Sequence, residues 1–291
     1  IRFSTGLHRQ VITSGYFLTS VTLLTLVYLF DAHVTGFGNY PSSWEFSIQK
    51  PADAALEVLT TSTLFIGITT WFRGFVFNWM LDPLAEFLIG LPWWYVIGLL
   101  SACVWLACNR GTAIVCVFGL LFIGATGLWS IGMFSMAQIL VSVVLCMAIG
   151  IPLGILAAVN NTFEAIIRPV LDAMQTLPAF CYLIPVLMFF GGNVVSAVIA
   201  IMIYSLPPVI RLTNLGIREV STEAIEAATS FGSTFSQTLL KVKIPLALPS
   251  IMMGVNQSMM MALAMLIITP LIGGGGIGRE VFVGLSQADT G

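Results

Sequence analysis

The chain has 291 residues, of which 58% are hydrophobic and 8% are charged, and its formal net charge is −2. A soluble domain carries about a quarter charged residues because its surface must be hydrated, so this composition excludes a soluble protein and indicates one that faces lipid. The basic residues form no dense run, so we expect no nucleic-acid partner.

Cysteine and histidine give no sign of a reactive or metal-binding centre. The five cysteines lie in apolar segments without a C-x-x-C pair, and His8 and His33 are isolated. Buried cysteine behaves as a small hydrophobic residue when no such pattern accompanies it. We therefore predict no catalytic residue, no metal site and no cofactor site in this chain.

Apolar runs along the chain predict membrane spans. A helix needs about 20 mainly apolar residues to cross the hydrocarbon core. Seven segments fit this description: 11–30, 93–108, 112–129, 135–159, 177–190, 194–210 and 246–269. The runs show no two-residue alternation, so they indicate helices and not barrel strands. The sequence predicts an all-α integral membrane protein, a polytopic helical bundle with about seven visible spans.

Lysine and arginine set the expected orientation, because they accumulate in cytoplasmic loops. With the N-terminus inside, eight of the eleven fall on the inner side. The inner residues are Arg2, Arg9, Arg110, Arg168, Arg211, Arg218, Lys241 and Lys243, and the outer ones are Lys50, Arg73 and Arg279. The opposite orientation would reverse this ratio, so we expect the N-terminus and the loop at 211–245 to be cytoplasmic.

The composition divides the chain at residue 92. Residues 1–92 hold the first span and a mixed segment whose aromatic run at 71–79 also contains Arg73 and Asn78. Burying these two polar groups in lipid is costly, so we expect a helix in the outer interface, with a bent membrane hairpin as the alternative. Residues 93–291 form the transmembrane core.

The polar inner loop at 211–245 is the candidate functional segment, since loops of this length usually carry function. We expect two short helices. Thr222 can cap the first and Gly232 ends it. Ser233 can cap the second, which is expected to run to Lys243 and stop before Pro245. Apolar faces, with Ile225 and Ala228 on the first helix and Phe235 and Leu239 on the second, favour docking into the groove of a partner protein.

The spacing in this loop resembles a known motif. Glu226-Ala227-Ala228, three residues, Gly232, nine residues and then 242–245, ending in Pro245, is similar to the "EAA" loop of ABC importer permeases, with Val242 and Ile244 as conservative departures. The resemblance implies the type I permease fold and a loop that docks on a cytoplasmic ABC ATPase. It also implies a second permease copy, an external substrate-binding protein and a bacterial inner-membrane location. ATP and Mg would then belong to the ATPase, and this chain would be no enzyme.

Three further segments narrow the resemblance. Residues 167–180, 205–213 and 254–258 look like those of glycine betaine/proline permeases, and the likeness covers roughly 91–291. It implies transport of glycine betaine, proline or a related methylated amine, with choline or trimethylamine N-oxide as alternatives. That family has one more span after the position of Gly291, and the chain lacks an initiator Met, so we expect residues to be missing at both ends.

Several residues are candidates for lining a translocation path. Asn256 and Gln257 are amides near the middle of a predicted span, and Phe180 and Tyr204 are aromatic residues that would suit a methylated cation. The amides could equally bond to a neighbouring helix, which we favour, and each ring could be packing. Arg168 and Asp172, four residues apart, are expected to form a local ion pair.

Two other functions compete. An ion-coupled secondary transporter commonly holds acidic groups at mid-membrane, yet no Asp or Glu occurs in the predicted spans from residue 93 onward. A non-transporting scaffold would explain a partner-binding loop but not a likeness spread over two hundred residues. The glycines at 273, 275 and 278 match a dinucleotide pattern only formally, and we expect an outer turn that belongs to a gate.

Overall fold

The computed structural model describes residues 4–30 and 61–287. The chain forms two units, 1–59 and 60–291. In the first, α1 (Ser4–Phe30) covers the expected span at 11–30. The rest of that unit, including the expected external segment up to residue 60, lies outside the described residues.

Residues 61–287 contain helices and turns and no strand, in agreement with the all-α prediction. The helices in chain order are α3 (Thr63–Phe75), η3 (Val76–Leu81), α4 (Asp82–Gly90), α5 (Trp93–Ala107), α6 (Arg110–Ala125), α7 (Trp129–Val159), α8 (Asn161–Thr176), α9 (Phe180–Phe190), α10 (Val194–Arg218), α11 (Thr222–Ser230), α12 (Phe235–Thr238), η4 (Leu239–Lys243), α13 (Ile244–Leu266), η5 (Thr269–Ile272) and α14 (Ile277–Ser286).

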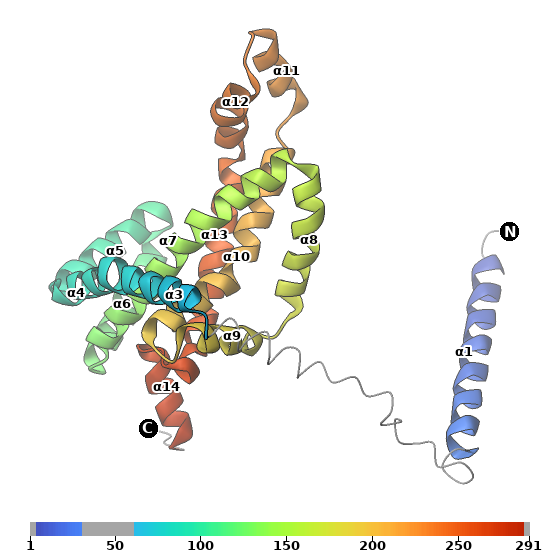
Figure 1. Cartoon of the computed structure of the whole chain (residues 1–291), viewed down its shortest axis with the longest axis horizontal. Helices are drawn as coiled ribbons and strands as arrows, with labels where there is room; N and C mark the ends of the chain where they lie inside the picture. Colours follow the sequence, from blue (N-terminus) through green and yellow to red (C-terminus); the bar gives the residue numbers. More distant parts are fainter. Residues whose placement is uncertain (1–3, 31–60, 288–291) are drawn as a thin grey trace. The chain divides into compact units, whose positions relative to one another are not determined.

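The core is a packed trio of α7, α10 and α13, with α10 in contact with both other helices (Figure 1). Small residues let the backbones approach closely. A Cβ on Gly154 of α7 would stand 2.6 Å from Thr213 Cβ of α10, and one on Gly216 of α10 would stand 2.6 Å from Ser250 Cβ of α13. Such contacts are typical of membrane helices, because lipid gives no hydrophobic force between them and close packing must hold them together.

Fewer helices are long enough to cross a membrane than the seven expected. In the described residues, four pass by length and composition: Thr63–Gly90, Trp129–Val159, Val194–Arg218 and Phe235–Leu266. Two of these contain the expected spans at 135–159 and 194–210, and a third covers the expected span at 246–269 as far as Leu266. The expected spans at 93–108 and 112–129 form α5 and α6, which have only 15 and 16 residues, below the roughly 20 needed for the full hydrocarbon core.

The expected span at 177–190 is also different in the structure. Its helix α9 has 11 residues and is long enough to cross only together with α8, to which it is joined by a bend of 107°. The cause is Pro178, since a residue before proline is driven out of the helical region, and Leu177 is extended. Helix α8 runs along the core beside α10 (Figure 1).

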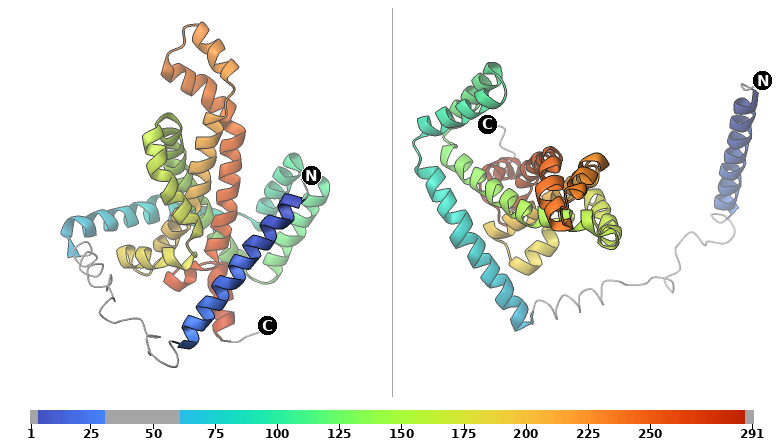
Figure 2. Two further views of the ribbon diagram at one scale, coloured as in Figure 1. Left: turned by 90° about the vertical axis from the view of Figure 1, so that its right-hand side faces the viewer. Right: turned by 90° about the horizontal axis from the view of Figure 1, so that it is seen from above.

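Helix α3, η3 and α4 form one rod that runs crosswise to α10 and α13 (Figures 1 and 2). Leu81 and Ala85 of this rod are buried in the same cluster as Ala137 and Val141, which lie in the first half of α7. That half of α7 belongs to the predicted outer side. The rod passes the length and composition test for a span, but its direction is that expected of a helix in the outer interface.

At the end of the core opposite α11 and α12, the glycine-rich turn before α14 is packed without spare room (Figure 1). A Cβ on Gly276 would stand 2.3 Å from Ser135 Oγ, and one on Gly274 would stand 2.8 Å from Thr269 Oγ1. Ser135 Oγ also accepts a hydrogen bond from the backbone N–H of Ile277 at 2.8 Å. In this state the turn closes tightly against α7.

Candidate functional site

The loop at 211–245 forms a helix–turn–helix that projects from one end of the core (Figure 1). Its first helix, α11, begins one residue earlier than a Thr222 cap would place it, since Ser221 is the N-cap and Thr222 the first helical residue. Glu226 and Ala227 are exposed on α11, and Ala228 is half-buried. The side of α11 that carries Glu226 and Ala227 is therefore not covered by other residues of this chain.

Gly232 makes the turn, as expected. Its φ is +79°, a left-handed conformation that favours glycine, and nothing lies within 4 Å of a Cβ built on it. The second helix is capped by Thr234 and not by the expected Ser233. Thr234 forms a capping box with Gln237, whose side-chain Oε1 accepts from the Thr234 N–H at 2.9 Å.

The second helix does not stop before Pro245. It continues from Phe235 to Leu266 as one helix of 32 residues. The π-helical segment η4 precedes Pro245, and the N–H of Ile244 reaches back to the carbonyl of Leu239. Proline has no N–H and its ring clashes with the carbonyl four residues earlier, and the wider π turn accommodates both effects. The loop is thus rigidly continuous with a core helix.

An apolar cluster anchors the loop to the core. We call it the inner cluster: Ile217, Val220, Ala247 and Ile251 are buried, and Ile225, Leu239, Ile244, Ile151, Ile155 and Ala158 pack around them. Ile225 of α11 and Leu239 of η4 therefore face inward. A cavity of about 260 Å³ between the two loop helices is lined by Ile225, Phe235 and Leu239, among others.

Two aromatic side chains are left outside at the tip of the loop. Phe231 is 91% exposed and Phe235 is 67% exposed. Phe235 was expected to share an apolar face with Leu239, yet Leu239 packs inward while Phe235 remains largely free. Exposed aromatic residues beside a helix are typical anchors for a protein groove.

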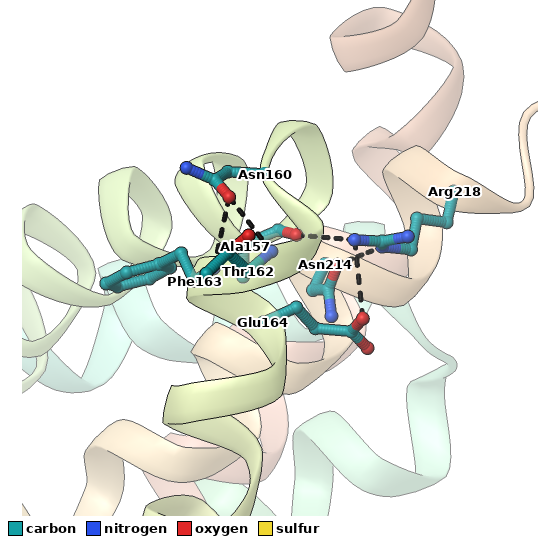
Figure 3. Close-up of polar contacts among 7 residues, drawn as sticks. All are labelled: Ala157, Asn160, Thr162, Phe163, Glu164, Asn214 and Arg218. Carbon is teal, nitrogen blue, oxygen red and sulfur yellow. Dashed lines mark hydrogen bonds and ion pairs between the residues drawn. The ribbon is translucent and has the colours of Figure 1, made fainter.

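Below the loop, a polar network joins α7, α8 and α10 (Figure 3). Arg218, the last residue of α10, donates to the Ala157 carbonyl at 2.7 Å and to Asn214 Oδ1 at 2.8 Å, and it pairs with Glu164 at 3.4 Å. The sequence interpretation used Arg218 only as an inner charge. The sequence does contain a sign of this contact: Arg218 is a basic residue in the last turn of α10, and Glu164 is an acidic residue in the first turn of α8.

The expected ion pair between Arg168 and Asp172 is not formed. Asp172 pairs with Arg211 of α10 instead, and in the described part of the chain Arg168 has no ion pair. The reason is the course of α8, which runs beside α10 and brings Asp172 within reach of Arg211.

The path candidates do not form one site within a single chain. Asn256 and Gln257 lie on the exposed face of α13, and neither bonds to another helix among the described residues. Phe180 is exposed at the start of α9, and Tyr204 is half-buried with its ring edge-to-face against Tyr182, the two centroids 5.6 Å apart. The bond to a neighbouring helix that we favoured for the amides is thus absent within one copy.

In the described residues, no three His, Cys, Asp or Glu side chains lie close enough together to hold a metal ion. The geometry defines a polytopic membrane protein in which the core helix α13 continues into an exposed helix–turn–helix.

Comparisons with known proteins agree with this class. A family model described as "binding-protein-dependent transport system inner membrane component" matches residues 150–291. The glycine betaine transport system permease protein OpuAB of Bacillus subtilis is 40% identical over 77% of this chain and 82% of its own length. The glycine betaine/carnitine transport permease protein GbuB of Listeria monocytogenes is 41% identical over 82% of this chain and 85% of its own.

A third relative is longer than this chain. The glycine betaine/proline betaine transport system permease protein ProW of Escherichia coli is 42% identical over 74% of this chain, which spans 60% of the length of ProW. The chain belongs to the family of ABC importer permeases, which are multi-pass inner-membrane components of transport systems.

Proposed function

We propose that this permease carries glycine betaine or a related methylated amine across the bacterial inner membrane, as a homodimer with cytoplasmic ABC ATPases and an external substrate-binding protein. The substrate class is supported by the names of the relatives, which transport glycine betaine. The single observation that supports the ATPase partner is the exposed helix–turn–helix, with Phe231 at its tip.

The loop is suited to transmit force as well as to bind. Glu226, Ala227 and Ala228 lie on a short helix, and the left-handed Gly232 directs the chain into a helix continuous with the core. A displacement of the tip therefore reaches α13 without a flexible joint. ATP and Mg would be held by the partner, since this sequence has no G-x-x-x-x-G-K-[ST] loop for phosphate.

We assign the exposed face of α13 to the path between the two copies. Asn256 and Gln257 lie there with Met252, Met253 and Met260. Amide groups facing lipid would lose their hydrogen bonds at a cost, which a second copy or a water-filled path removes. Methionine adapts to a moving surface. Phe180 and Tyr204 add aromatic surface suited to a methylated cation.

The loop assignment is tested by capture of the ATPase and by uptake into vesicles. Gly232→Leu and Glu226→Lys should abolish ATPase capture and uptake while the membrane core keeps its thermal stability. Phe231→Ala should weaken capture, and Phe87→Ala, which removes an exposed ring from α4 at 62% exposure, is the matched control and should not. Wild-type capture and uptake in both Gly232→Leu and Glu226→Lys would overturn the docking role.

The substrate class is tested separately on the binding protein of the assembled complex. We expect binding of glycine betaine, choline, proline or trimethylamine N-oxide, measured by calorimetry. Binding of a sugar or an anion, with none of these four bound, would refute the substrate class and leave the permease assignment in place.

A further inference from the structure

Arg218 stands where the chain leaves the core for the loop, and it holds three helices together (Figure 3). Its Nη2 donates to the carbonyl of Ala157 in the last turn of α7 and faces Glu164 in the first turn of α8. Its Nε donates to Asn214, one turn earlier on α10. We call these four residues the Arg218 cluster.

The contacts in the cluster satisfy polar groups at the end of α7 and the start of α8. The last carbonyls of a helix have no donor within that helix, and α7 ends at Val159, so the Ala157 carbonyl requires an outside donor. Glu164 lies in the first turn of α8, where the helix dipole favours an acid. Asn160 fixes that first turn, because its Oδ1 accepts from the N–H groups of Thr162 and Phe163 (Figure 3).

The geometry requires arginine specifically. A guanidinium has five N–H donors in a fixed plane and can bond in two directions at once, whereas an ammonium is a single point. Here Nε bonds within α10 while Nη2 reaches both α7 and α8. A lysine at this position could keep one of these contacts but not all of them.

The Arg218 cluster is also tied to the loop by a very short connection. Only residues 219–221 separate Arg218 from α11, and Val220 among them is buried in the inner cluster beside Ile225 of α11. The connection is too short to absorb much of a displacement of α11, so the displacement reaches Arg218. The opposite side of Arg218 is the junction of α7 and α8.

We propose that Arg218 is a positioning residue that transmits displacement of α11 to the junction of α7 and α8, with Glu164 and Asn214 holding its guanidinium in place. The inference rests on the proposed docking of the loop on an ATPase. Through this route the loop moves α7 and α8 as well as α13, so that all three of these helices, which contact α10, respond together.

The experiment uses the complete complex in vesicles, with equal amounts of assembled Arg218→Met, Arg218→Lys and Glu164→Gln variants. We expect Arg218→Met to capture the ATPase normally but to take up about tenfold less radiolabelled glycine betaine per ATP hydrolysed, the factor typical of losing a hydrogen bond to a charged group. Arg218→Lys and Glu164→Gln should fall between it and the wild type.

Arg168→Gln is the matched control. Arg168 and Arg218 both line one cavity between α8 and α10. Arg168 is exposed and makes no ion pair among the described residues, so its replacement removes one positive charge without affecting a contact to α7. A purely structural role for Arg218 would lower the thermal stability of the complex but not uptake per ATP. An unchanged ratio in Arg218→Met, or an equal fall in Arg168→Gln, would overturn the inference.

A second measurement does not depend on the solute. Spin labels at Thr162→Cys on α8 and Thr222→Cys on α11 should keep their distance when ATP is added to the wild-type complex, because the cluster moves both together. With Arg218→Met the distance should change on ATP addition, and identical behaviour in the two proteins would refute transmission through Arg218. If the wild-type chain captures no ATPase, the proposed docking fails and this inference falls with it.

Discussion

At the level of single residues, a buried and an exposed glycine allow the effect of helix packing to be distinguished from the effect of helix propensity. Gly154 faces α10 so closely that a Cβ would stand 2.8 Å from the Ile210 carbonyl oxygen, whereas a Cβ on Gly119 of α6 would meet nothing within 4 Å. Alanine normally stabilises a helix over glycine by about 0.5–1 kcal/mol. We therefore expect Gly119→Ala to be neutral or stabilising, and Gly154→Ala to destabilise by about 1–3 kcal/mol through overpacking.

Thermal unfolding in the same detergent checks this pair. The two changes are chemically identical, so a difference in sign can only come from the surroundings of each glycine. Equal effects at both positions would contradict the close approach of α7 and α10.

The sequence predicted some residue roles well and others not at all. Gly232 was identified as a turn because only glycine takes a left-handed φ at no cost, a property of one residue. The Arg218 cluster was missed because its contacts join residues up to 61 positions apart, and Asp172 was assigned to Arg168 because spacing along one helix is visible in a sequence whereas contact with Arg211 is not.

At the scale of elements, Pro245 links the loop to the core. It follows the π-helical segment η4, and in a regular helix its ring would clash with the preceding turn. Pro245→Ala would let η4 relax to an α-helix, which shifts the register by one residue and turns the loop by about 100° relative to α13. We expect higher thermal stability, since proline costs a helix interior up to about 3 kcal/mol, together with reduced uptake.

Thermal unfolding and uptake, measured on the same Pro245→Ala preparation, test the expected gain in stability and the expected loss of transport. Loss of both would indicate that Pro245 is needed for folding, and retention of wild-type uptake would show that the loop does not depend on the π segment. Leu248→Ala on the exposed side of α13 is the control for a change beyond η4.

Element boundaries followed from the sequence where the signal was local. Asn109 and Asn193 cap the starts of α6 and α10 with their side chains, and each lies in a short polar turn between two apolar runs. Three predictions depended on packing and were wrong: the stop before Pro245, the separate span at 177–190, and the number of full-length spans. Proline reads as a break in a sequence, yet neighbouring turns can widen around it, as η4 does.

For the whole molecule, the length of the rod Thr63–Gly90 and its course favour different positions in the membrane. Its 28 residues would measure about 42 Å as a helix, enough to cross the roughly 30 Å hydrocarbon core with a tilt. Its course, however, is crosswise to α10 and α13 (Figure 2). In the sequence, Arg73 and Asn78 fall in the middle section of the rod. A cation and an amide at mid-membrane would be costly, whereas both suit the interface.

We therefore expect the rod to lie in the outer interface, with both of its ends outside. Single cysteines at Thr63, Gly90, Glu226 and Glu280, all exposed, can be introduced in a cysteine-free chain. A membrane-impermeant thiol reagent should label the cysteines at 63, 90 and 280 in intact cells, and the one at 226 only after permeabilisation. Labelling of 63 and 90 from opposite sides would show that the rod crosses. Labelling of 226 in intact cells would overturn the orientation, since a loop outside the membrane could not meet a cytoplasmic ATPase.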